Sequence, residues 1–142
     1  MLKYVDYKNQ QQAKFDKLPM KVAFGDEQFR EMMSEWGLTT SDEDLKKIVS
    51  LDAGAYCLKE DKHLFDEFIE QSLKDDEEYF KNDDQLKEAF LYEFGNHECA
   101  YTGNPYEALS ALNYTKKELE EDERLARIFK QSWREYIDNY EW

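Results

Sequence analysis

Apolar side chains in the last quarter of the sequence recur every three or four residues over about four helical turns. The set is Leu125, Ile128, Phe129, Trp133, Tyr136, Ile137 and Tyr140. This spacing puts them on one face of an α-helix, and the capping-box run Thr115-Lys116-Lys117-Glu118 predicts where that last helix begins. We expect the stripe from Trp133 to Trp142 to lie in the core. If it were exposed, it would be a binding face, because Trp and Tyr are the usual interface anchors.

Similar patterns predict elements along the rest of the chain. The expected helices are residues 3–17, a segment after Gly25-Asp26, a segment from Glu60 with Leu64, Phe65, Phe68, Ile69 and Leu73 on one face, a segment from about Asp83, and one that starts at Asn104-Pro105. The expected strands are residues 20–24, 48–51 and 55–58, of which the last two form a hairpin. With no linker in view, we predict one domain over residues 1–142, an α+β fold that is mostly helical with a small antiparallel sheet of about three strands.

Charge limits what such a chain can contact. The 33 acidic and 19 basic residues give a net charge of −14, which disfavours direct binding to nucleic acid or to anionic lipid. Aromatic residues make up 15% of the chain, more than a disordered acidic tail would carry. No apolar run approaches the roughly 18 residues of a membrane span, and no stretch of signal-peptide type follows Met1. We therefore expect a folded cytoplasmic protein with no membrane partner.

The acidity is concentrated in residues 60–88, which have a net charge of −8. A calcium loop does not fit these acids, because the required glycine is missing. One interpretation is a solvated helix face, the common outcome for a run of charges. The other is a surface that imitates a phosphate backbone and binds a partner protein with a basic surface. The candidate partner-binding residues are Asp66, Glu67, Glu70, Asp75, Asp76, Glu77, Glu78, Asp83 and Asp84.

Chemistry-bearing motifs are few. Phosphate-binding glycine loops and the GxSxG elbow are absent from the sequence, so we expect a non-enzymatic protein without cofactors. Glu93 and His97 have the i,i+4 spacing of helical metal ligands, and Cys99 follows closely. Together with Cys57 and His63 they leave a metal site open as an alternative. The other interpretation is a hydrogen-bonded polar pair that lies beside the core and has no metal.

Several pieces of the chain, in order, resemble a family of small proteins of unknown function found in phages and in gut Firmicutes. The matching pieces are Met20–Phe29, Ala55–Lys59, Tyr92–Glu98, Tyr101–Gly103 and Ala108–Asn113. Members of that family are richer in glycine just before the second hairpin strand, where this chain has Asp52-Ala53-Gly54-Ala55. The resemblance implies no catalytic residues. It implies a viral or mobile-element gene that acts inside a bacterium.

This context makes an inhibitor of a host nucleic-acid-binding protein the leading hypothesis, including an anti-CRISPR or other anti-defence role. Two alternatives stay open. One is a self-associating accessory protein, a homo-oligomer joined through the last helix. The other is a metal-binding module or enzyme centred on Glu93 and His97.

Overall fold

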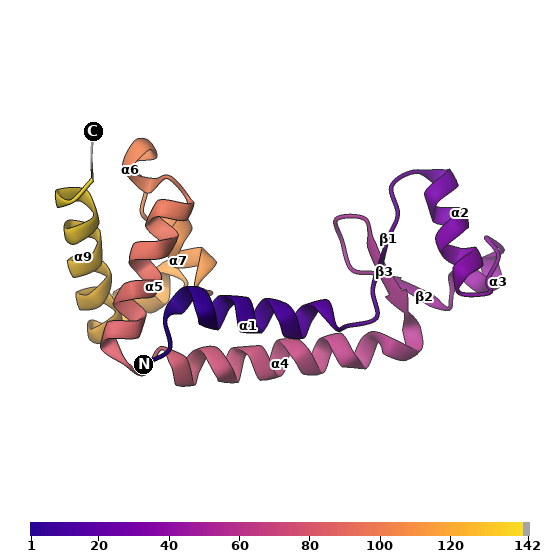
Figure 1. The fold of residues 1–142 in the computed structure, drawn as a ribbon, viewed down its shortest axis with the longest axis horizontal. Helices are drawn as coiled ribbons and strands as arrows, with labels where there is room; N and C mark the ends of the chain where they lie inside the picture. Colours follow the sequence, from indigo (N-terminus) through magenta and orange to yellow (C-terminus); the bar gives the residue numbers. More distant parts are fainter. Residues whose placement is uncertain (141–142) are drawn as a thin grey trace. The chain divides into compact units, whose positions relative to one another are not determined.

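The computed structural model describes residues 1–140, and it confirms a mostly helical α+β fold with a three-stranded antiparallel sheet (Figure 1). The elements in chain order are α1 (Tyr4–Asp16), β1 (Lys21–Val22), α2 (Asp26–Glu35), α3 (Asp42–Leu45), β2 (Ile48–Ser50), β3 (Ala55–Leu58), the short 3-10 helix η1 (Lys59–Asp61), α4 (Lys62–Tyr79), α5 (Asp83–Asn96), α6 (Cys99–Thr102), α7 (Tyr106–Ala111), α8 (Lys116–Glu121) and α9 (Glu123–Asp138).

The chain forms two compact units. Unit 1 contains residues 1–10 and the chain from Lys74 onward, and unit 2 contains residues 11–73. The helices α1 and α4 each contribute residues to both units. The assignment of residues 1–142 to a single domain stays a prediction.

Unit 2 is built around the sheet, whose strand order is β1-β3-β2 with both pairs antiparallel. The predicted hairpin is confirmed, with Val49 opposite Cys57 in the register. The first strand is shorter than expected, because only Lys21 and Val22 pair with β3. Beside the sheet, α2 buries Met32 and Met33 together with Ala23, so this unit has its own small core.

The hairpin turn depends on a glycine. Gly54 has a φ of +79°, and a Cβ there would lie 2.5 Å from Cε1 of Phe24. Its carbonyl also accepts a 2.9 Å hydrogen bond from the N–H of Ala23. A side chain at this position would be strained by the positive φ, and the exposed Phe24 ring would also have to move.

Unit 1 is held by the packing of α5 against α9, and Figure 1 shows these two helices side by side. Phe90 and Phe94 of α5 are fully buried. Phe129 meets Phe90 edge-on with ring centroids 5.3 Å apart, and Trp133 meets Phe94 at 5.1 Å. Such edge-to-face pairs stabilise a core beyond the area they bury. The predicted core role of the α9 stripe is confirmed through Trp133 and Tyr136, whereas Tyr140 is exposed and Trp142 lies outside the described residues.

The prediction of one last helix from Thr115 was wrong. Thr115 does form the capping box with Glu118, but the helix it opens, α8, ends at Glu121. Asp122 then takes an extended conformation, and its side chain accepts from the N–H of Leu125 to cap α9. An Asp side chain competes in this way with helix continuation, because it offers the backbone another hydrogen-bond partner.

The expected apolar face of the helix after Glu60 was also partly wrong. Phe65 is buried, but Ile69 and Leu73 of α4 are 56% and 54% exposed. At the later helix start, the structure places the N-cap at Pro105, while the Asn104 side chain accepts from the N–H of Tyr106. None of the helices within residues 1–140 is long and apolar enough to cross a membrane.

Candidate functional site

The acidic run at the end of α4 has an inner side and an outer side. Asp75 and Asp76 are partly buried, whereas Glu77 and Glu78 are exposed. Asp76 accepts a short hydrogen bond from the Tyr7 hydroxyl. Burial raises the pKa of Asp76, although hydrogen bonds from Tyr7 and Asn113 act in the opposite direction. Asp76 is therefore part of the packing of unit 1, and Glu77 and Glu78 face solvent.

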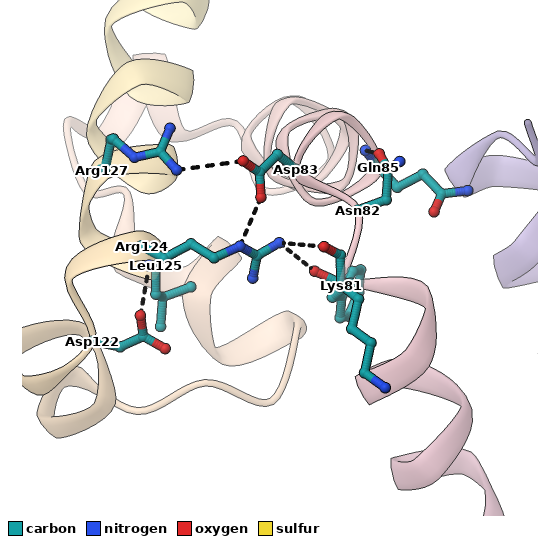
Figure 2. A network of polar contacts seen from close by, with 9 residues as sticks. Lys81, Asn82, Asp83, Gln85, Asp122, Arg124, Leu125 and Arg127 are labelled. Carbon is teal, nitrogen blue, oxygen red and sulfur yellow. Dashed lines mark hydrogen bonds and ion pairs between the residues drawn. The ribbon is translucent and has the colours of Figure 1, made fainter.

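Asp83 joins the start of α5 to the start of α9 (Figure 2). Its carboxylate accepts from Nε of Arg124 at 2.7 Å and from Arg127 at 3.4 Å. The same Arg124 donates to the carbonyl oxygens of Phe80 and Lys81, at 2.7 and 3.0 Å. The hydrogen bond from Arg124 lowers the pKa of Asp83. This carboxylate thus links α5 to α9 through two arginines, and 52% of its side chain remains exposed.

Among the other predicted acids of unit 1, Asp84 is exposed and Glu78 pairs with Lys81 at 2.8 Å. Both side chains of that pair are more than 60% exposed, and exposed pairs of this kind contribute little to stability. Glu77, Glu78 and Asp84 are therefore exposed predicted residues of unit 1 that no arginine engages, whereas the exposed Asp83 is shared by two arginines.

The remaining three predicted acids lie on the part of α4 that belongs to unit 2. Asp66, Glu67 and Glu70 are all exposed, and Asp66 pairs with Lys62 at 2.6 Å. The sequence interpretation of a solvated acidic helix face therefore fits this segment, and so does a charged contact surface.

Among the described residues of unit 1, Glu93 is the most deeply buried charged side chain, with 1% of its surface exposed. Its Oε1 accepts from the Tyr4 hydroxyl at 2.9 Å and from Nζ of Lys8 at 2.8 Å. Its Oε2 accepts from Nδ2 of Asn96 at 3.4 Å and lies 3.2 Å from Nε2 of His97. Both oxygens of the carboxylate are thus occupied by partners, which is what a buried charge requires.

The charges of this cluster are fixed by their surroundings. Burial alone would raise the pKa of Glu93, but the hydrogen bonds from Lys8 and Tyr4 outweigh it and lower the pKa. Burial and the neighbouring Glu93 charge raise the pKa of the Tyr4 hydroxyl far above its usual value. Glu93 therefore stays ionised and Tyr4 stays protonated at neutral pH.

The metal hypothesis finds no support in this geometry. Within residues 1–140 no three His, Cys, Asp or Glu side chains are arranged to hold a metal ion. Cys99 is buried, and burial raises the pKa of its thiol. Cys57 and His63 belong to unit 2, whereas His97 and Cys99 belong to unit 1. His97 instead lies between two carboxylates, since its Nδ1 is 3.8 Å from Glu107.

The sequence interpretation missed Tyr4 and Lys8. These two residues have i,i+4 spacing on α1, so they share a helix face, and that face meets Glu93. A polar pair at this spacing in a helix with few apolar residues was the only signal in the sequence.

The family of the chain follows from comparison with known families. A family model described as a family of unknown function, DUF7659, matches residues 3–135. The chain belongs to this family. The match includes Tyr4, Lys8 and Glu93 as well as all nine predicted acids, so both candidate sites lie within the family's region. No curated protein and no solved structure matches the chain.

Proposed function

We propose that the protein is a non-enzymatic binding protein that inhibits a nucleic-acid-binding protein of a bacterial host. Its contact surface in unit 1 is the exposed acidic pair at the end of α4, Glu77 and Glu78. The observation that carries the proposal is the division of the acidic run, in which Asp76 and Asp83 serve the fold and this pair faces solvent.

Electrostatics supports this kind of partner. The segment 60–88 has a net charge of −8, and such a concentration attracts a basic groove that otherwise holds phosphates. Exposed carboxylates orient an approaching basic partner and speed its association more than they add to the affinity. The protein acts in the bacterial cytoplasm, where such partners occur. The resemblance to phage proteins favours a defence nuclease, including one of CRISPR type, as the partner.

Affinity capture from a bacterial lysate tests the proposal. Tagged wild-type protein is compared with the double variant Glu77→Lys/Glu78→Lys, which leaves Asp76 and Asp83 intact. The expected result is a nucleic-acid-binding protein that duplex DNA displaces from the wild type. We expect the variant to bind it about tenfold more weakly or worse, and salt to weaken the wild-type complex.

A matched control removes the effect of net charge. The variant Glu120→Lys/Glu121→Lys makes the same charge change at an exposed pair on α8, where Glu121 approaches Lys117 at 4.0 Å. It is expected to bind like the wild type. Equal loss in both variants would reduce the effect to overall charge, and full binding by the Glu77 and Glu78 variant would refute the surface.

A further inference from the structure

Unit 2 contains a pocket of about 450 Å³ beside the β2–β3 hairpin. Small-molecule sites usually have volumes of roughly 300–1,000 Å³, with an apolar wall and a few polar groups. This pocket has both parts. Trp36, Leu38 and Leu58 line it, and so do three lysines, Lys46, Lys47 and Lys59.

The apolar wall follows from the way α2 ends. Trp36 is the C-cap of α2, and Gly37 then takes a φ of +72°. The chain reverses, so that the N–H of Leu38 donates to the Met33 carbonyl at 2.8 Å. Trp36 and Leu38 both pack partly against the small core of unit 2. The indole is therefore held on a firm base while part of it lines the pocket.

Two of the lysines, Lys47 and Lys59, lie opposite each other at the end of the hairpin. The register that pairs Ile48 with Leu58 continues by one residue, because the N–H of Lys59 donates to the Lys47 carbonyl at 2.7 Å. Like charges directly opposite each other in a hairpin are destabilising. Asp44 neutralises Lys47 at 3.0 Å. Within residues 1–140 no carboxylate pairs with Lys46 or Lys59.

We propose that this pocket binds a free nucleoside phosphate, a role that does not depend on the proposed function. The base lies against Trp36 and the phosphate lies against Lys46 and Lys59. A phosphate carries up to two negative charges, which matches two unneutralised ammonium groups. Aromatic side chains stack on the π-face of any base.

A free nucleotide fits better than a longer nucleic acid. The net charge of −14 repels a polyanion that extends beyond the pocket. Glu60, which also lines the pocket, is an acceptor that suits a sugar hydroxyl or a base amino group. A simple aromatic phosphate such as phosphotyrosine lacks the sugar hydroxyls and the base amino group that a nucleotide offers to this acceptor.

Isothermal titration calorimetry with the full chain tests the site, using AMP, adenosine, inorganic phosphate and phosphotyrosine as probes. AMP is expected to bind about tenfold more tightly than each of the other three. Phosphate binding as tightly as AMP would overturn the role of the base. Tighter binding of phosphotyrosine would point to a phosphopeptide and overturn the nucleotide. No heat with AMP up to about 10 mM would overturn the site.

Variants locate the binding. Lys46→Gln/Lys59→Gln is expected to weaken AMP binding about tenfold or more. The control Lys116→Gln/Lys117→Gln removes two exposed lysines from α8, where Lys116 lies over the Tyr106 ring at 4.5 Å. It is expected to leave AMP binding unchanged. Equal effects in both variants would assign the binding to general charge. In the NMR spectrum of the wild type, adding AMP is expected to shift the backbone amide signals of Leu58 and Lys59, and their absence among the shifted signals would overturn the site.

Discussion

Replacing Glu93 by glutamine removes one negative charge from the interior of unit 1 with almost no change in shape. Glutamine has one acceptor oxygen in place of two. If that oxygen keeps the Oε1 position, it still accepts from Tyr4 and Lys8, and its NH₂ group then faces Asn96 and His97. If that oxygen takes the Oε2 position, the donors of Tyr4 and Lys8 point at the NH₂ group of the glutamine. Either orientation therefore loses part of the network.

The expected cost can be worked out from these contacts. A hydrogen bond to a charged group contributes about 1.5–3 kcal/mol and a neutral one about 1 kcal/mol. The Tyr4 contact is buried and loses its charge assistance in full. Lys8 is 44% exposed, so water compensates much of its loss. We expect Glu93→Gln to lower the free energy of unfolding by about 2 kcal/mol, a large fraction of the roughly 5–15 kcal/mol typical of a folded protein.

Urea unfolding followed by circular dichroism measures this cost. The control is Glu35→Gln on α2, because Glu35 makes an even shorter ion pair with Lys21, at 2.6 Å, but is 63% exposed. Exposed pairs contribute about 0–1 kcal/mol, so the control is expected to stay close to the wild type. If Glu93→Gln costs no more than Glu35→Gln, the burial argument for Glu93 fails.

The same variant predicts a pH dependence. The ordinary pKa of a glutamate is 4.5, and the folded protein lowers that of Glu93. The ionised form therefore stabilises the fold fully above pH 4.5, and this contribution is lost as the pH falls through the lower folded-state pKa. The difference in unfolding free energy between wild type and Glu93→Gln should accordingly shrink below about pH 4.5. A constant difference down to pH 2 would contradict the ionic role of Glu93.

Two further replacements in unit 1 follow from the same reasoning. Burial raises the pKa of Asp76, so its ionised form costs stability at pH 7. Asp76→Asn still accepts from Tyr7 and is expected to leave the unfolding free energy within about 0.5 kcal/mol of the wild type or to raise it. A loss of about 2 kcal/mol in urea unfolding would contradict this. Arg124→Met removes three hydrogen bonds, one to Asp83 and two to carbonyls, and should lower the free energy of unfolding by about 1–2 kcal/mol and with it the melting temperature. Arg127→Met breaks one 3.4 Å contact and should lower the free energy of unfolding by less than about 0.5 kcal/mol. Equal costs would refute the role of Arg124.

Local patterns predicted the elements of this fold well. The 3–4 spacing of apolar residues placed α5 and α9, the Thr115 capping box formed as expected, and the hairpin has the predicted strands. These signals succeed because each depends on residues within a few positions of one another. The break at Asp122 was missed because an Asp inside a periodic pattern is compatible with either a helix interior or a new cap.

The candidate sites were harder to predict because they depend on residues distant in sequence. Glu93 and His97 were identified from their spacing, but Tyr4 and Lys8 reach Glu93 across more than eighty positions. The local sequence of α1 and that of α5 do not indicate that these residues come into contact. The polar pair beside the core is the better interpretation of Glu93 and His97, although His97 keeps 33% of its side chain exposed.

Acid count alone overstates the surface that a partner can use. Asp76 and Asp83 belong to the same run as Glu77 and Glu78, yet a tyrosine and an arginine engage them within the fold. Reversing the whole run would therefore also break contacts within unit 1, so a loss of binding would not by itself report on the partner. Glu77 and Glu78 are exposed and have no comparable role in the fold. A loss of binding on reversing the charge of this pair alone therefore reports on the contact with the partner. The division of the run between fold and surface is what makes the proposed function testable.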